Sequence, residues 1–352
     1  MTTPEIWFQR RLPAYNFHFF ASPKGLFFNL YTMKDLHDRD ASVEFYEARY
    51  EEGYMEEWDE SKKNKVREIL KSLPLPSQGK ALDFGCGNGV FTAILKECLP
   101  AWEIYGVEIS KVAVANASKR LPSCKFFIAE DANRYQQFFD FIFSHHVIEH
   151  VPDLNETFQT INAYLKPQSY QLHILPCGNA GSYEYNIAEL KKNGIEKDKE
   201  NRFFFEEPGH LRRLTSKEFE DWESKIGFHL ERDYYANQFH GAVNWITKSS
   251  PRFVKKLTDD QDAVNEDARQ KLKALRRQLL PLTYSQFPYS KYWLIQSKWK
   301  KSMGDKLKQL ALFIPGQLSK SIFTRLERAS NEEWQKQKHE KNGSEMFLFF
   351  KR

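Results

Sequence analysis

Three glycines at two-residue spacing, Gly85, Gly87 and Gly89, directly follow an apolar run that ends at Phe84. Glycine lets the backbone turn sharply and lets a ligand lie directly against it. Glu108 ends the next apolar run, nineteen residues after Gly89. A carboxylate at that place can accept hydrogen bonds from both hydroxyls of a ribose. Together these residues predict a binding site for an adenosine derivative.

The glycine spacing separates two kinds of adenosine cofactor. A dinucleotide fingerprint has the form G-x-G-x-x-G, and its third glycine allows close packing of helix and strand beside a pyrophosphate. In this chain Val90 stands where that third glycine would be needed. Asp83, two residues before the first glycine, would meet a cationic group better than a pyrophosphate. We therefore favour a cationic adenosine cofactor, and NAD is the alternative.

The elements that must position these residues follow the order of strand, glycine turn and helix. Ala81 and Leu82 belong to a short apolar strand, and a helix-compatible segment runs from Val90 to Leu99. In open α/β sheets the ligand binds beyond the carboxyl ends of the strands. We therefore expect an α/β fold that carries its site on the turn after this strand.

The segment from Leu82 to Gly89 resembles the first motif of the class I S-adenosylmethionine-dependent methyltransferases, which has the form hydrophobic-D-x-G-x-G-x-G. The family's acidic ribose-binding residue falls on Glu108. The resemblance continues over about residues 80–176 and implies a Rossmann-like, seven-stranded sheet with S-adenosylmethionine as cofactor. The cofactor-binding residues that it implies are Asp83, Gly85, Cys86, Gly87, Gly89, Glu108, Ile109, Asp131, Ala132, Ser144, His145 and Tyr50.

Two groups of these cofactor-binding residues lie at the ends of later predicted strands. Residues 126–132 predict a third strand that ends in an acidic residue, and the family residue matching Asp131 bonds the adenine amino group. Residues 139–153 resemble the fourth strand and its exit loop. There the family's backbone reaches the methionine part of the cofactor, at Ser144 and His145.

An aromatic-rich segment, residues 1–40, precedes the motif, and Ala41 to Leu73 predict a single helix with an aromatic face. We expect the first segment to pack on the main domain, because a free tail would not carry so many rings. In the resembled family an aromatic helix before the first strand closes over the cofactor. Tyr50 and Tyr54 are therefore candidates for contact with cofactor or substrate, and packing on the sheet is the alternative.

The last nine residues, 344–352, form a short apolar strand, which in the resembled family is antiparallel and lies between the fifth and sixth strands. The sixth strand is expected over Gly227–Ala236, after a helix from Thr215 to Ile226 with a capping box. The expected organisation is an N-terminal extension with lid helix (1–75), a cofactor-binding core (76–240 plus 343–352) and a helical insertion before the last strand (241–342).

That insertion is basic, with 21 Lys+Arg against 10 Asp+Glu, although the whole chain has a formal charge of only +5. Its leucines recur at helical spacing, and aromatic residues alternate with lysines over 284–301. We expect a helical cap that either contacts an anionic membrane or shields the pocket. Nucleic acid is not expected, because no nucleic-acid motif is present. The oligomeric state stays open.

Histidine is the usual proton acceptor at neutral pH, and a hydroxyl that accepts a methyl group must lose its proton. His146 lies on the predicted exit loop of the fourth strand, His150 follows it at a helix start, and His210 precedes Thr215. These three histidines are the catalytic candidates. Capping and packing are the alternative roles of His150 and His210.

The run from His146 to His150 also resembles ubiquinone-pathway O-methyltransferases, in which a Glu-x-x-Glu-His run can hold a divalent cation. Glu149 and His150 match that run, but His146 replaces its first carboxylate. Imidazole suits an oxygen-loving ion such as Mg²⁺ poorly, so we expect no metal.

The chain has four widely spaced cysteines and no apolar run near the ~20 residues that span a bilayer. We therefore expect a cytoplasmic protein that at most contacts a membrane peripherally. The expected activity is transfer of a methyl group from S-adenosylmethionine to an oxygen of a small-molecule, sugar or lipid-linked acceptor. The alternatives are an NAD-dependent oxidoreductase or epimerase and a catalytically silent Rossmann-like binding module.

Overall fold

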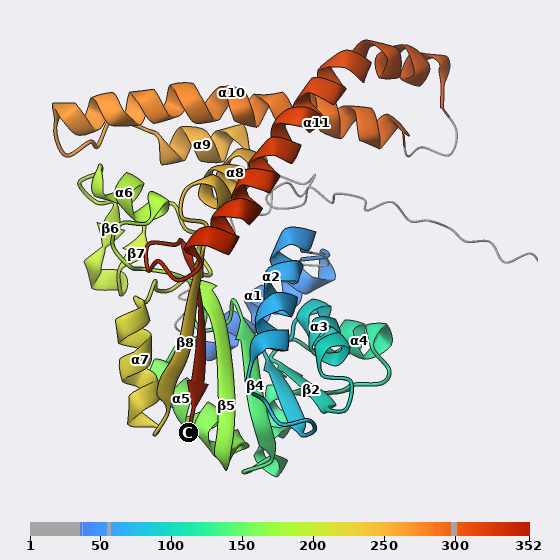
Figure 1. Ribbon diagram of the computed structural model, residues 1–352, viewed down its shortest axis with the longest axis vertical. Coiled ribbons are helices and arrows are strands. Elements are labelled where there is room, and N and C mark those ends of the chain that lie inside the picture. Colours follow the sequence, from blue (N-terminus) through green and yellow to red (C-terminus); the bar gives the residue numbers. More distant parts are fainter. Residues whose placement is uncertain (1–35, 37, 55–57, 297–300) are drawn as a thin grey trace, which may run out of the picture.

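The computed structural model describes residue 36 and residues 38–54, 58–296 and 301–352 (Figure 1). A seven-stranded sheet forms its centre, with the strand order β3-β2-β1-β4-β5-β9-β8. The strands are β1 (Lys80–Phe84), β2 (Glu103–Glu108), β3 (Lys125–Ile128), β4 (Phe139–His145), β5 (Leu165–Pro176), β8 (His229–Ala236) and β9 (Glu345–Lys351). The expectation for the segment 1–40 falls almost wholly outside the described residues.

The last strand occupies the predicted place. β9 runs antiparallel to both β5 and β8 and lies between them, while the pairs from β3 to β5 are parallel. α7 (Ser216–Lys225) precedes β8 and begins with the predicted capping box of Thr215 and Glu218. The seven-stranded, Rossmann-like fold with a helical insertion before the last strand is therefore confirmed.

The sheet is buried on both faces because its strands are apolar on both sides. Successive residues of β1 show this, since Ala81 packs with α2 (Glu60–Ser72) and α3 (Val90–Cys98), whereas Leu82 packs with α5 (Leu154–Tyr164) and α7. β9 alternates in the same way through Phe347 and Leu348. This rigid centre holds the strand ends in fixed positions.

The single helix expected over Ala41–Leu73 is wrong. The structure has α1 (Arg39–Glu51) and α2, and between them Gly53 adopts a φ of 86°. Asp59 then caps α2 by accepting a hydrogen bond from the backbone of Ser61. The aromatic pattern continues across this break, which is why the sequence pattern alone does not locate it.

The other helices carry the crossovers and the insertion. They are α4 (Lys111–Arg120), the 3₁₀ helices η3 (Ala129–Arg134) and η4 (Lys197–Lys199), α6 (Tyr183–Glu189), α8 (His240–Lys248), α9 (Pro251–Leu257), α10 (Glu266–Gln296) and α11 (Met303–Gln337). A two-stranded sheet joins β6 (Ile195–Glu196) to β7 (Arg202–Phe203). α8 to α11 lie above the carboxyl end of β5 (Figure 1). Among the described residues no helix has the length and apolarity to cross a membrane.

Candidate active site

The glycine turn joins β1 to α3, and its backbone explains the glycine spacing. Gly85 and Gly87 have φ values of 75° and 49°, which side chains other than glycine rarely adopt. A Cβ on Gly85 would come within 2.4 Å of Val147, on the exit loop of β4. A Cβ on Gly87 would lie 2.8 Å from the hydroxyl of Tyr50, on α1. The turn therefore presents bare backbone between the β4 exit loop and α1.

The carboxylate of Glu108 lies at this turn, as the sequence predicts. It accepts hydrogen bonds from the backbone N–H of Gly87 (3.0 Å) and Ile109 (2.8 Å). Burial raises the pKa of Glu108, while these backbone donors oppose the shift. A buried carboxylate beside a glycine backbone fits a ribose diol, so the residues present fit the adenosine part of S-adenosylmethionine.

Two residues of the motif, Asp83 and Cys86, contact other parts of the protein, although we expected Asp83 to face a cationic group. The Asp83 carboxylate is buried and accepts a hydrogen bond from the hydroxyl of Thr92 at 2.5 Å, which ties β1 to α3. Burial raises the pKa of Asp83 to about 7. The Cys86 side chain packs on Gly106 of β2. Both side chains therefore shape the turn from its inner side.

Four other predicted cofactor residues lie at two strand ends, those of β3 and β4. Asp131 lies in η3 after β3, is exposed and forms an ion pair with Arg134 at 3.6 Å. Ala132 lies beside it in the same helix. Ser144 lies in β4, is buried, and its hydroxyl is hydrogen-bonded to His173 inside the sheet, so its side chain does not face a ligand. The His145 ring stacks on Phe91 of α3 with centroids 3.7 Å apart.

Helix α1 connects the glycine turn to the histidines. Its Glu47 accepts a hydrogen bond from Ser110 at the start of α4, and its Tyr50 lies over Gly87. One turn earlier along the helix, the hydroxyl of Tyr46 lies 2.7 Å from His150 Nδ1. This helix therefore covers the region between the turn and the β4 exit loop, which is the place predicted for a lid.

His150 has the protonation state of a proton acceptor. Its Nδ1 lies 2.8 Å from the carbonyl oxygen of Gly209, and since a carbonyl only accepts, we assign the ring hydrogen to Nδ1. Nε2 then keeps its lone pair, 3.9 Å from a Glu149 oxygen. Burial, together with the charge of neighbouring His210, lowers the pKa of His150 to about 4. The ring is therefore neutral at pH 7.

His210 has the opposite character, which corrects our expectation that it could be the base. Burial would lower its pKa, but the hydrogen bond and charge of Glu206, with the charge of Glu207, raise the pKa of His210 to about 9. Its Nδ1 lies 2.9 Å from the Glu206 carboxylate. A ring that is already protonated at neutral pH cannot accept a proton, so His210 is a charged donor beside His150.

This ion pair makes stability depend on pH in the alkaline range. The pKa of His210 is about 9 in the folded protein, against an ordinary value of 6.5. Protonated His210 therefore contributes fully to the free energy of unfolding below pH 6.5, and this contribution is lost as pH rises through 9. We expect the wild type to lose up to about 3 kcal/mol more unfolding free energy between pH 6.5 and 9.5 than His210→Gln. Urea unfolding at both pH values measures this, and equal losses would contradict the raised pKa.

His146 bridges two buried carboxylates. It has a φ of 53° on the exit loop, with Nδ1 2.8 Å from a Glu149 oxygen and Nε2 2.9 Å from a Glu345 oxygen. The ammonium of Lys62 lies 2.8 Å from the same Nε2 and pairs with Glu345. Despite burial, Lys62 and His146 lower the pKa of Glu345 to about 2. Both ring nitrogens thus face charged partners, and His146 ties the loop to β9.

Two groups of side chains among the described residues have the proximity of metal ligands, His145 with His146 and Glu345, and Glu149 with His150 and His210. In the first group the Lys62 ammonium already occupies the cation position. In the second group His210 carries a proton held by Glu206. The expectation of no metal is therefore kept as a prediction.

Sequence reasoning missed several charged residues of the site because their partners are distant in the chain. Arg49 of α1 pairs with Glu207 at 2.9 Å, and Tyr54 donates to the same carboxylate at 3.4 Å. Glu345 opens an otherwise apolar strand, which is a visible signal for a buried carboxylate with a partner. The paired acids Glu206 and Glu207, just before His210, are a second such signal.

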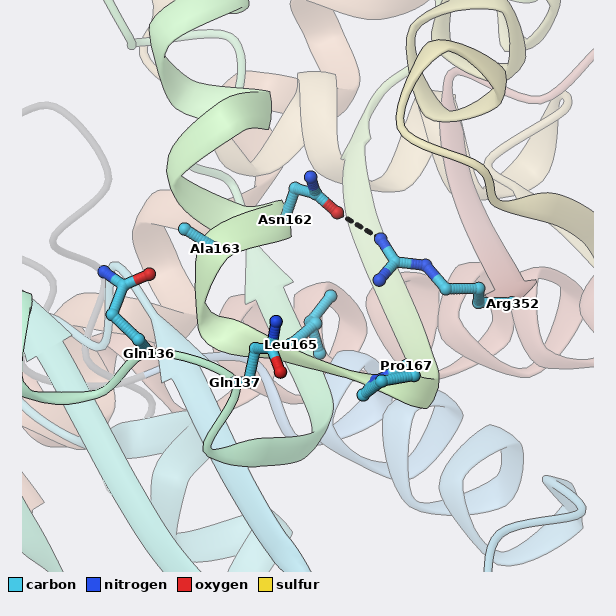
Figure 2. Close-up of a pocket in the computed structure, with 7 residues that line it drawn as sticks. All are labelled: Gln136, Gln137, Asn162, Ala163, Leu165, Pro167 and Arg352. Atoms are coloured by element: carbon cyan, nitrogen blue, oxygen red, sulfur yellow. Dashed lines mark hydrogen bonds between the residues drawn. The ribbon is translucent and has the colours of Figure 1, made fainter.

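A pocket elsewhere holds none of the predicted site residues. Figure 2 shows this hollow of about 500 Å³, lined by Gln136, Gln137, Asn162, Ala163, Leu165, Pro167 and Arg352. It lies where β5 begins and β9 ends, whereas the glycine turn follows the carboxyl end of β1. The two therefore lie at opposite ends of the parallel strands.

Part of the chain matches curated methyltransferases. A trans-aconitate 2-methyltransferase of Escherichia coli O157:H7 (strain EC4115 / EHEC) is 35% identical over 102 residues, which are 29% of this chain. The match spans about 40% of the length of that relative.

Solved structures with a similar fold have low sequence identity. The YcgJ protein of Bacillus subtilis is 15% identical with a TM-score of 0.41, covering 59% of this chain and 87% of that one. Phosphoethanolamine N-methyltransferase 2 of Haemonchus contortus, in complex with S-adenosylmethionine, is 16% identical with a TM-score of 0.39. That match covers 82% of this chain and 52% of the other.

A family model described as a methyltransferase domain matches residues 55–232, which is half of the 352 residues. The matched range contains the glycine turn, Glu108 and all three candidate histidines. The alternatives of an NAD-dependent oxidoreductase and a silent binding module are therefore not retained. The chain therefore belongs to this methyltransferase domain family.

Proposed function

We propose that this chain methylates an oxygen atom of a small-molecule, sugar or lipid-linked acceptor, with His150 as the group that takes the acceptor proton. The observation that carries the proposal is the bonding of His150, whose Nδ1 is held by the Gly209 carbonyl. That contact fixes the ring and leaves Nε2 unprotonated. The other two histidines are both held by carboxylates.

The cofactor-binding part of the proposal assigns a role to each residue at the turn. Glu108 holds the ribose, the backbone at Gly85 and Gly87 lies against the cofactor, and Tyr50 covers it from α1. Asp131 and Ala132 approach the adenine, and the backbone at Ser144 and His145 approaches the methionine part. The bound cofactor supplies a sulfonium methyl group, which is electrophilic without further activation.

The charges around His150 support proton transfer to it. Glu149 is fully buried, and despite that burial the charge and hydrogen bond of His146, with the charge of His210, lower its pKa to about 2. A permanently charged carboxylate 3.9 Å from Nε2 stabilises the imidazolium as it forms. His146 and His210 act as positioning residues in this arrangement, since they hold Glu149 and the His150 ring.

Closure of the site is the third element of the proposal. α1 contacts the turn, the β4 exit loop and, through Arg49, the segment before α7. A helix that contacts all three can exclude water from the reacting atoms and hold an acceptor in line with the methyl group. We therefore also propose the expected division of the chain, in which an N-terminal extension with its lid helix (1–75) closes over a cofactor-binding core (76–240 plus 343–352).

The location and partners of the protein follow from the same proposal. The four cysteines are unpaired in the structure, which supports a reducing, cytoplasmic location. A lipid-linked acceptor would require peripheral contact with an anionic membrane through the insertion, residues 241–342.

The proposal is tested by release of S-adenosylhomocysteine from S-adenosylmethionine with an acceptor panel. The panel contains phenols, sugars, a lipid-linked sugar, trans-aconitate, and amines of matched size. Turnover with a hydroxyl acceptor is expected, since a carboxylate has already lost its proton and would leave His150 with no proton to take. Turnover confined to amines would contradict oxygen methylation and leave the methyltransferase assignment in place.

A further inference from the structure

The outer half of the insertion is a helical arm, made of the second half of α10 and the first half of α11. The two helices pack on each other and stand away from the sheet (Figure 1). α11 turns Gly316, Ser319 and Phe323 inward, and at Gly316 a Cβ would lie only 3.3 Å from Tyr292 of α10. This spacing of three and four residues defines one face of α11 as its packing face.

The opposite face of α11 carries an exposed apolar stripe, Met303, Leu307, Leu310, Ile314 and Leu318. Their exposed fractions lie between 63% and 76%. Steps of four, three, four and four residues keep all five on one side of the helix, and at 1.5 Å per residue the stripe is about 22 Å long. Scattered surface leucines need no explanation, but a continuous row of this length indicates an interaction surface.

The arm is strongly basic. Residues 284–325 contain eight Lys and Arg residues and a single acidic residue, Asp305. On α11, Lys306, Lys308 and Lys320 are exposed and lie on the flanks of the stripe. Lysines at the border of an apolar face can keep their ammonium groups at headgroup level while the stripe is buried.

We propose that this stripe docks on an anionic membrane surface, with the flanking lysines on the lipid headgroups. A second copy of the chain fits less well, because burying the two stripes together would bring two arms of the same positive charge into contact. An anionic bilayer complements both properties of the arm, since it takes up apolar area and attracts lysines.

The arm is fixed to the methyltransferase core, so docking would orient the site. The carboxylate of Glu333, near the end of α11, accepts hydrogen bonds from the backbone N–H of Phe239, His240 and Gly241 (2.8 to 2.9 Å). α11 then leads to β9, where Glu345 reaches His146. The inference rests on the surface alone and does not depend on the proposed oxygen acceptor.

Vesicle flotation tests it with the full chain. The probes are vesicles of phosphatidylcholine alone and of phosphatidylcholine with phosphatidylglycerol, across a salt series. We expect the wild type to float with anionic vesicles at low salt, less at high salt, and weakly with neutral vesicles. The variant Leu307→Gln/Leu310→Gln/Ile314→Gln should bind at least about tenfold more weakly, because the stripe loses its apolar face.

Controls separate docking from folding. The three substituted side chains are exposed and glutamine is a good helix former, so the variant should keep its unfolding midpoint and its affinity for S-adenosylhomocysteine. Val264→Gln, at an exposed apolar residue outside the arm, should float like the wild type. Absence of flotation at low salt, or equal flotation of the triple variant, would overturn the proposal. Self-association that the triple variant abolishes, without flotation, would assign the stripe to a second copy.

Discussion

Replacing His150 by glutamine should lower methyl-transfer turnover by ~10²–10⁴ while the affinity for S-adenosylhomocysteine stays unchanged. Glutamine keeps a donor for the Gly209 carbonyl but has no lone pair that takes a proton at the place of Nε2. The ring contacts Tyr46 and Gly209, whereas Glu108 bonds the backbone of the glycine turn. His229→Gln, at an exposed position that begins β8, is the matched control and should retain full turnover.

The pH profile distinguishes a base from a structural role. Because the pKa of His150 is lowered to about 4, its active neutral form persists from pH 7 down to about pH 5 and is lost as pH falls toward 4. Wild-type turnover should follow that curve, and His150→Gln should lack the titration. Unchanged turnover, or a wild-type midpoint near the ordinary value of 6.5, would move the proton acceptor to another group such as His146.

Replacing Arg213 by alanine should lower the free energy of unfolding by about 3–5 kcal/mol. Its guanidinium is 3% exposed and donates to Glu206 at 2.7 Å and to the carbonyl of Cys177 at 2.9 Å. It also pairs with the buried carboxylate of Glu184 and donates to the carbonyl of Ser344. Without it Glu184 would stay buried without a cation and Glu206 would keep only His210, which costs far more than the loss of a surface pair.

The matched control for Arg213 is Lys217, four residues along the chain. Lys217 pairs with Asp221 at 2.7 Å, but both side chains are exposed and screened by solvent, so Lys217→Ala should leave the free energy of unfolding nearly unchanged. Urea unfolding of the two variants beside the wild type gives both values. If both variants changed the free energy of unfolding equally little, the ion pairs of Arg213 would not be buried as the structure shows.

The parts that were predictable from sequence are those encoded within one strand–turn–helix unit. Gly85 and Gly87 adopt backbone angles that glycine tolerates, and Glu108 lies at the turn because β2 pairs with β1 in parallel. Such features depend on neighbours close in the chain. The place of β9 came from the family resemblance and was also correct.

The parts that were not predictable depend on partners far apart in the chain. One such contact joins Lys62, His146 and Glu345, which lie on or next to α2, β4 and β9. Because these residues are far apart in the chain, their spacing in the sequence does not predict the contact. His210 was expected as a base since its type permits that role. Its environment decides otherwise, because Glu206 lies four residues earlier on the same segment and holds the proton.

Asp83 shows how a motif can suggest a residue without showing its contact. The resemblance marks Asp83 as part of the cofactor motif, and we expected it to face a cation. In the fold its carboxylate points to Thr92 inside the β1–α3 junction. A strand residue can face either side of the sheet end, and only the packed structure decides which.

The central claim is that the cofactor lies at the glycine turn with its ribose on Glu108. Calorimetric titration with S-adenosylhomocysteine tests it most directly, on the wild type, on Glu108→Ala and on Glu103→Ala, an exposed control in the same strand. We predict one binding site in the wild type and in the control, no binding of NAD, and binding weakened by roughly 2–4 kcal/mol in Glu108→Ala. Equal affinity of Glu108→Ala and the wild type would contradict the claim.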